Sequence, residues 1–325
     1  MVLASQESPA SKFPPSNHPC VVLLGLSFHL PDDSPVMSSS RHQRTLGKPV
    51  QVEGFGYWSG RDVRVEFRPA DEHTGIVFVR TDLGGRRIPA VVANRFETPR
   101  RTTLASEGAT VEMVEHIMAA LAGLRIDNCE ICVDSAEMPG CDGSSQAFVE
   151  ALTAAEFVAQ PAIRRALVVR ETTRLGTADC WIEARPNPAG ALSLKFHLDY
   201  GPGNSVGRQT LALPVTIDSF RRELAPSRTF LLKSEADWLV SQGLGKRTTP
   251  RDLLIFDTAG PIDNELRYHD ECVRHKSLDL VGDLALAGCD LIGHFVAYRS
   301  GHRLNADLVR TLLSEVVPTE VRRTA

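Results

Sequence analysis

Hydrophobic residues alternate with polar ones over several short segments in the first half of the chain. Residues 50–56 and 62–68 show this period of two, with a turn-like Trp58-Ser-Gly60 between them. Successive side chains of a strand point to opposite faces, so the pattern predicts two paired strands. The Val- and Ile-rich segments 76–80 and 88–92 predict two more.

A helix is predicted from about Thr110, taken as its N-cap, with Glu112 in the first turn. One apolar stripe follows at helical spacing, formed by Val114, Ile117, Met118, Leu121 and Leu124. A strand at 129–133 and a helix at about 145–156 complete the first half.

The second half repeats this order of elements. Strands are predicted at 165–171, 181–185, 191–198, 253–256 and 291–298, and helices at 233–242, 271–287 and 305–317. Two halves that each run strands, helix, strand, helix predict an α+β fold of two similar α/β-sandwich domains. We expect the first domain at 41–160 and the second at 161–325.

Residues 1–40 are rich in Pro and Ser and lack periodicity, which predicts a disordered leader. An alternative is that Met37 is the true start. Residues 20–28 are apolar, but no small-x-small cleavage site follows them, so secretion is not expected. No apolar run approaches the ~20 residues of a membrane span. We therefore expect a cytoplasmic protein without a transmembrane segment.

Composition narrows the class of protein. The 325 residues contain 36 Lys and Arg against 40 Asp and Glu, a net charge of −4, which argues against a general nucleic-acid binder. Seven cysteines without framework spacing indicate a reducing compartment. Cys129 and Cys132 lie on a predicted strand, where residues three apart point to opposite faces, so they make a poor metal clip.

The segment 274–283 carries the clearest candidate chemistry. His275 and Asp279 are four residues apart, so on a helix they share one face and can bind one metal ion, and Asp283 extends that face by a turn. Imidazole and carboxylate ligands suit zinc. The alternative is a simple ion pair on an exposed helix.

Two further segments add polar groups. Glu115 and His116 are adjacent on an otherwise apolar helix, where a general base beside a metal ligand would explain them. A helix end that reaches solvent is the alternative. His302 lies in Ser300-Gly-His302 on a predicted loop, where Asp283 could hold it protonated. By pattern alone, it could equally be a surface residue.

Several motifs in order resemble a known family. They are Met113-Val-Glu-His116, residues 119–128, Asp142-Gly-Ser144, residues 275–283 and Tyr298-Arg-Ser-Gly-His-Arg-Leu-Asn305. From about residue 44 to 317, the chain resembles the UDP-3-O-acyl-N-acetylglucosamine deacetylases, zinc amidases of lipid A biosynthesis. The resemblance implies two α+β domains packed face to face around a zinc cleft.

The resemblance also implies roles for individual residues. His116, His275 and Asp279 match the ligands of one zinc ion per chain, Glu115 the general base, and His302 the cationic general acid with Asp283 as its partner. Thr229 matches a hydroxyl that holds the oxyanion. The implied substrate contacts are Lys276 near the diphosphate, Phe230, and Phe196 against the uracil.

The implied reaction is hydrolysis of the N-acetyl group of UDP-3-O-acyl-N-acetylglucosamine, with release of acetate, by a monomer. One alternative is a related zinc amidase acting on another acylated amino sugar. A second is a non-catalytic binding protein of the same fold. The only partner expected is the UDP-linked acylated glucosamine.

Three segments depart from the family pattern, at Trp58, at Cys141, and at Arg247 and Thr248, where two glycines are usual. Glycines let an alkyl chain approach the backbone, and side chains fill that space. In the family that the chain resembles, this last segment helps to form an apolar passage for the fatty-acyl group of the substrate. Side chains at Arg247 and Thr248 therefore predict a narrower acyl passage and a preference for shorter acyl chains. If Arg247 points outward, the loop is merely rearranged.

Overall fold

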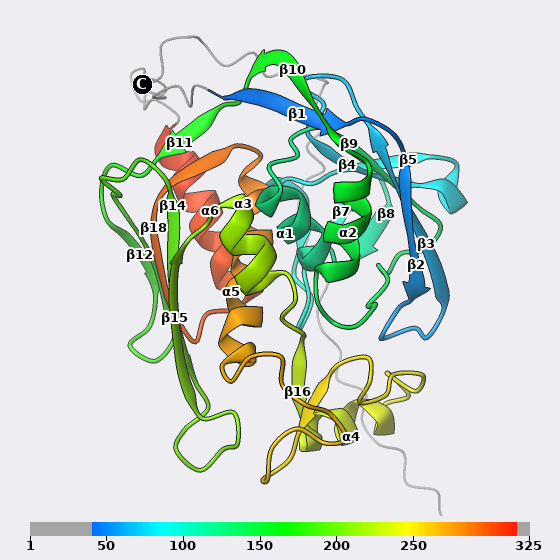
Figure 1. Cartoon of the computed structure of the whole chain (residues 1–325), viewed down its shortest axis with the longest axis vertical. Helices are drawn as coiled ribbons and strands as arrows, with labels where there is room; N and C mark the ends of the chain where they lie inside the picture. The colour runs from blue at the N-terminus through cyan, green and yellow to red at the C-terminus, as the bar shows by residue number, and fades with distance from the viewer. Residues whose placement is uncertain (1–40, 317–325) are drawn as a thin grey trace, which may run out of the picture. The chain divides into compact units, whose positions relative to one another are not determined.

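The computed structural model describes residues 41–316. The first of its two main sheets has the strand order β2-β3-β9-β4-β5 (Figure 1). These strands are β2 (Val50–Phe55), β3 (Asp62–Pro69), β4 (Ile76–Arg80), β5 (Arg86–Pro89) and β9 (Cys129–Val133). β9 is antiparallel to β3 and parallel to β4, and the two outer pairs are antiparallel.

The second sheet repeats this arrangement with the order β12-β13-β18-β14-β15. Its strands are β12 (Thr173–Gly176), β13 (Trp181–Arg185), β14 (Leu192–Asp199), β15 (Arg208–Pro214) and β18 (Asp290–Tyr298). β18 is antiparallel to β13 and parallel to β14, as β9 is in the first sheet. β11 (Ala166–Val168) adds to β18 in parallel. The predicted α+β fold with an internal duplication is confirmed.

The helices follow the same repeat. α1 (Glu115–Gly123) precedes β9 and α2 (Gln146–Ala154) follows it, while α5 (Glu271–Leu284) precedes β18 and α6 (His302–Val316) follows it. These helices lie between the two sheets (Figure 1). Each sheet therefore buries one apolar face under its own helices, and the helices of the two halves pack on each other.

Smaller elements surround this frame. η1 (Thr81–Leu83) and η2 (Val92–Asn94) precede a three-stranded sheet of β6 (Arg95–Phe96), β7 (Thr103–Ser106) and β8 (Ala109–Glu112). β1 (His42–Leu46) pairs with β10 (Phe157–Ile163). α3 (Ile217–Ser219), η3 (Phe220–Leu224) and η4 (Ala285–Ala287) are single turns.

An insert separates β15 from α5. It contains β16 (Phe230–Leu232), α4 (Lys233–Ser241) and β17 (Leu254–Phe256), with β16 parallel to β17. The insert lies at one end of the helices (Figure 1).

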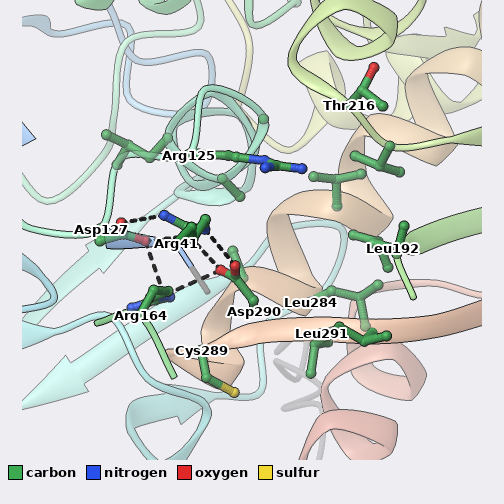
Figure 2. Close-up of a pocket in the computed structure, with 18 of the residues that line it drawn as sticks. Arg41, Arg125, Asp127, Arg164, Leu192, Thr216, Leu284, Cys289, Asp290 and Leu291 are labelled. Atoms are coloured by element: carbon green, nitrogen blue, oxygen red, sulfur yellow. Dashed lines mark hydrogen bonds and ion pairs between the residues drawn. The ribbon is translucent and has the colours of Figure 1, made fainter. Parts of the chain in front are cut away.

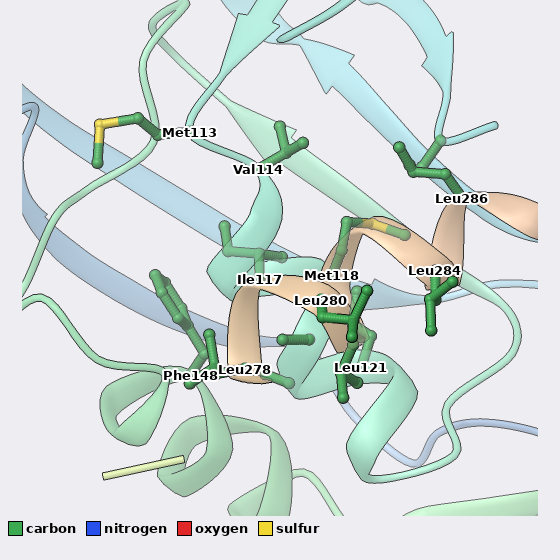
Figure 3. Packing of buried hydrophobic residues seen from close by; sticks show 14 of the residues in the cluster. Met113, Val114, Ile117, Met118, Leu121, Phe148, Leu278, Leu280, Leu284 and Leu286 are labelled. Atoms are coloured by element: carbon green, nitrogen blue, oxygen red, sulfur yellow. The ribbon is translucent and has the colours of Figure 1, made fainter. Parts of the chain in front are cut away.

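α1 and α5 approach very closely. A Cβ atom built on Gly282 of α5 would lie 2.1 Å from the carbonyl oxygen of Glu115 on α1, so only glycine fits. Figure 3 shows Met118 and Leu121 of α1 packed beside Leu280 of α5. This contact joins the two halves of the chain through their central helices.

Two predicted helix starts are wrong. Thr110 is not an N-cap, because residues 109–112 form β8 and the backbone of Glu112 bonds to Ala136. Met113 then has a φ of 58°, which ends the strand before α1 begins at Glu115. The last helix begins at His302 rather than at residue 305.

The predicted domain boundary between residues 160 and 161 falls inside β10, and it remains a prediction. The predicted leader at 1–40, with Met37, lies outside the described residues. None of the helices within residues 41–316 has the length and apolar character needed to cross a membrane.

The contact at Gly282 can be tested by Gly282→Ala. The added methyl must push α5 away from α1, so we expect a loss of roughly 1–3 kcal/mol in the free energy of unfolding, measured by denaturant titration. Gly203→Ala is the matched control, because a Cβ there meets nothing within 4 Å. Equal stability of the two variants would contradict the close contact.

Candidate active site

Three side chains from α1 and α5 converge at the close contact of the two helices. His116 of α1 faces His275 and Asp279 of α5, and all three are buried. One potential ligand atom from each lies within 4.8 Å of the others. Asp279 Oδ1 is 3.3 Å from His275 Nε2 and 3.6 Å from His116 Nε2. The three residues therefore form one cluster of nitrogen and oxygen donors.

The protonation of this cluster suits a bound cation. His275 Nδ1 is 3.1 Å from the carbonyl oxygen of Ser227, which makes Nδ1 the protonated nitrogen and leaves the Nε2 lone pair facing the cluster. Burial lowers the pKa of His275 to about 3, so the ring is neutral. Asp279 Oδ1 is buried and has no hydrogen-bond partner among the described residues. A buried carboxylate oxygen without a partner is costly, and a metal ion would satisfy it.

Glu115 lies beside the cluster as the first residue of α1. Its side chain is almost fully buried, and burial raises the pKa of its carboxyl. Oε2 accepts a hydrogen bond of 3.0 Å from the backbone amide of Thr102, and Oε1 lies 4.0 Å from His302 Nε2. A carboxylate held in this way is suited to accept a proton.

Asp283 holds His302 from the far side of the ring. The fully buried carboxylate accepts hydrogen bonds from Thr102 Oγ1 at 2.7 Å, Asn305 Nδ2 at 2.8 Å and His302 Nδ1 at 2.9 Å. Burial opposes protonation of His302, but the negative charges of Asp283 and Glu115 raise its pKa to about 9. The ring is therefore a cation at neutral pH, and its Nε2–H is directed toward Glu115.

The predicted substrate residues Lys276 and Phe230 border the cluster. Lys276 Nζ is 2.8 Å from Asp279 Oδ2 and 5.9 Å from the centre of the Phe230 ring. Tyr200, which the sequence analysis missed, is 37% exposed and packs edge-on against Phe230 at 5.8 Å. These residues give the site one aromatic and cationic edge.

The assignment of Phe196 to substrate packing is corrected. Phe196 is 1% exposed and belongs to the hydrophobic core on β14, between its partners Leu211 and Ala297. No face of its ring is free for a ligand. Tyr200 follows the end of the same strand and reaches the surface instead, which makes it the better aromatic candidate.

An apolar cavity of about 130 Å³ extends from the cluster into the insert. Glu115, His116 and Thr229 line its inner end. The insert supplies most of its walls, through Leu231, Ala236, Leu239, Val240, Leu253 and Ile255.

Arg247 points away from this cavity. Its guanidinium is 2.5 Å from Asp62 and lies 4.3 Å from the centre of the Phe55 ring, at the hairpin of β2 and β3. The expectation that Arg247 narrows the passage is therefore corrected. Thr248 does line the cavity, and its hydroxyl donates to the carbonyl of Tyr57 at 3.4 Å.

The structure also locates Trp58 and Cys141, the other two departures from the family pattern. Trp58 lines the same cavity, and Cys141 bonds through its backbone carbonyl to the Tyr57 hydroxyl at 3.2 Å. Cys129 and Cys132 are buried free cysteines on β9, outside the His-His-Asp cluster.

A buried donor set of two histidines and one aspartate, next to a carboxylate and a cationic imidazole, is typical of metal-dependent hydrolases. The comparisons with known proteins agree with this class. The family model of UDP-3-O-acyl N-acetylglycosamine deacetylase (LpxC) matches residues 43–314. The chain belongs to this family and is therefore a deacetylase. The family is one of metalloenzymes.

Curated relatives cover nearly the same region. A UDP-3-O-acyl-N-acetylglucosamine deacetylase of Chlamydia felis is 38% identical over 86% of this chain and 99% of the relative. The proteins of that name from Syntrophus aciditrophicus and Brucella ovis are 35% and 36% identical, over 84% and 86% of this chain and 86% and 98% of their own lengths. The family predicted from the motifs is confirmed.

The effect of Asp283 on the pKa of His302 can be tested by titration. Asp283→Asn removes the negative charge beside the ring, so the pKa of His302, raised to about 9 in the wild type, should fall toward its ordinary value near 6.5. The measurement is an NMR titration of the histidine rings in metal-free protein. Thr102→Val removes one hydrogen bond to Asp283 but leaves its charge, so it should move the pKa much less. An unchanged pKa in Asp283→Asn would contradict the assignment.

Proposed function

We propose that this chain hydrolyses the N-acetyl group of UDP-3-O-acyl-N-acetylglucosamine in lipid A biosynthesis, producing acetate and the free amine. One observation carries the mechanism: a buried donor cluster has both a general base, Glu115, and a cationic acid, His302, within reach of the same point. Amide hydrolysis needs both groups, because water must lose a proton and the leaving nitrogen must gain one.

His116, His275 and Asp279 would hold one zinc ion per chain. A zinc ion bound there supplies a Lewis acid that polarises the amide carbonyl and lowers the pKa of water. The partnerless Asp279 Oδ1 and the free Nε2 of His275 support this assignment.

Glu115 would take the proton from the attacking water. The backbone amide of Thr102 holds Oε2, which leaves Oε1 on the side of His302 and the cluster. Because burial raises its pKa, the carboxyl is a stronger base than an exposed glutamate.

His302 would donate its Nε2 proton to the sugar nitrogen as the carbon–nitrogen bond breaks. Its charge also favours the negative oxygen that develops on the amide carbon, and the hydroxyl of Thr229 would add a hydrogen bond to that oxygen. Asp283 keeps Nδ1–H engaged, so the reactive proton is the one on Nε2.

The substrate would lie across the two edges of the site. Its acyl chain fits the apolar cavity formed by the insert, with Thr229 and Glu115 at the inner end. Its uridine diphosphate fits the edge formed by Tyr200, Phe230 and Lys276, which combines aromatic rings with a positive charge.

Metal content and acetate release, measured together, test this function. Glu115→Gln should retain zinc and lose roughly 10²–10⁴-fold in kcat, because only the base is removed. His275→Ala should lose both zinc and activity. The exposed Glu53→Gln is a control for the loss of a carboxylate and should resemble the wild type. Full zinc occupancy in His275→Ala, or an unchanged kcat in Glu115→Gln, would contradict the assigned roles.

The acyl passage gives a separate prediction. Thr248→Gly removes a side chain from the cavity wall, so kcat/KM for longer acyl chains should rise relative to shorter ones, by up to about fourfold for each additional buried methylene, or ~0.8 kcal/mol. Thr177→Gly is the matched control, because the exposed Thr177 does not line the cavity and its loss should leave the length profile unchanged. If both variants keep the wild-type profile across a series of acyl lengths, Thr248 does not limit the passage.

A further inference from the structure

A second, larger cavity of about 640 Å³ lies at the C-terminal ends of α1 and α5 (Figure 2). Its volume is within the ~300–1,000 Å³ typical of small-molecule sites. It shares no lining residue with the cavity next to His116. Both halves of the chain contribute to it, through the last turns of α1 and α5 and through β11, β14 and β18.

One wall of this second cavity is apolar. Leu121 and Leu284 form part of its base and are almost fully buried. Further apolar residues are only partly covered by protein, which leaves part of their surface for a ligand: Ala122, Val168, Leu192, Val215, Ala285 and Ile292.

The other wall carries a closed network of ion pairs. Arg41 bonds to Asp127 at 2.7 Å and to Asp290 at 2.6 Å, and Arg164 Nε lies 3.0 Å and 3.3 Å from the same two carboxylates (Figure 2). Two cations and two anions balance in this network. It therefore adds no net charge to the cavity.

Arg125 lies outside this network and adds one positive charge to the cavity. It is exposed, and no ion pair or side-chain hydrogen bond joins it to another residue of the 41–316 region. Figure 2 shows its side chain extending away from Arg41. A single unpaired cation beside an apolar wall is complementary to a ligand with one negative charge and an apolar body.

The backbone at Arg125 strengthens this interpretation. Arg125 follows the C-cap of α1 with a φ of 58°, and its amide bonds to the carbonyl of Ala122 at 3.0 Å. Glycine is the usual residue at this left-handed position, where a side chain costs roughly 1 kcal/mol. A cation favours the C-terminal end of a helix, but a residue within the last turn would give that benefit without the positive φ.

We propose that this cavity binds a fatty-acid anion, with its carboxylate on Arg125 and its alkyl chain along the wall formed by Leu192 and Ile292. The guanidinium suits a carboxylate, since it can donate two parallel hydrogen bonds to it. The single uncompensated charge selects a monoanion over a diphosphate. The site is distinct from the acyl passage of the insert.

Calorimetric titration with dodecanoate tests the proposal on the full-length, metal-loaded protein. Arg125→Gly should weaken binding roughly tenfold, or about 1.4 kcal/mol, since one charge-assisted interaction is lost. Arg125→Lys should retain most of the affinity. The glycine variant should fold at least as stably as the wild type, because glycine fits the left-handed position. Dodecanol, which lacks the charge, should bind the wild type and Arg125→Gly equally.

Two controls separate this site from the acyl passage. Leu192→Trp fills the second cavity and should abolish the Arg125-dependent binding, with folding checked by its melting temperature. Deacetylation by Arg125→Gly should have an unchanged kcat/KM, because Arg125 is remote from the proposed catalytic residues. The proposal is overturned if the wild type does not bind dodecanoate, or if its affinity is the same in the wild type and Arg125→Gly.

Discussion

The close approach of α1 and α5 is the constraint on which the site depends. Gly282 allows α5 to pass directly under the carbonyl of Glu115, where any side chain would collide. At this distance, His116 on α1 comes within ligand distance of His275 and Asp279 on α5. The duplicated fold makes this possible, because each half places one such helix on the inner face of its sheet. The candidate metal site is therefore a product of the packing between the halves.

The same packing buries three carboxylates beside two partly buried cations. Glu115, Asp279 and Asp283 lie in one region with two cations, Lys276 and His302. Buried ions are costly unless they are paired or hydrogen-bonded. Asp283 satisfies this condition with three donors, but Asp279 keeps one oxygen without a partner. The excess of negative charge next to the neutral imidazole of His275 is the electrostatic argument for a bound cation.

The walls of the cavity proposed as the acyl passage depend on contacts between the insert and the first half. Arg247 pairs with Asp62, and the Tyr57 hydroxyl donates to the carbonyl of Asp252. These contacts join residues that are almost two hundred positions apart. They fix the loop that carries Thr248 at the cavity, so a substitution in the β2–β3 hairpin could change the passage without touching the substrate.

The sequence by itself determined the duplicated order of strands and helices, the family and the candidate chemistry of the His275–Asp279 face. These are local properties: alternation reports a strand, and a spacing of four places two ligands on one helix face. It misplaced the start of the first helix, because the pairing of β8 and the positive φ of Met113 override the helical pattern there.

Only the tertiary structure decided which side chains meet and which are covered. Phe196 on β14 is buried in the hydrophobic core, whereas Tyr200, which directly follows β14, is exposed at the surface. The tertiary structure also turned Arg247 outward, and it brought Thr102, which no motif marks, to both Glu115 and Asp283. The physical reason is that burial, ion pairing and hydrogen bonding here join residues far apart in the chain, and no local pattern records which of these distant partners will be in contact.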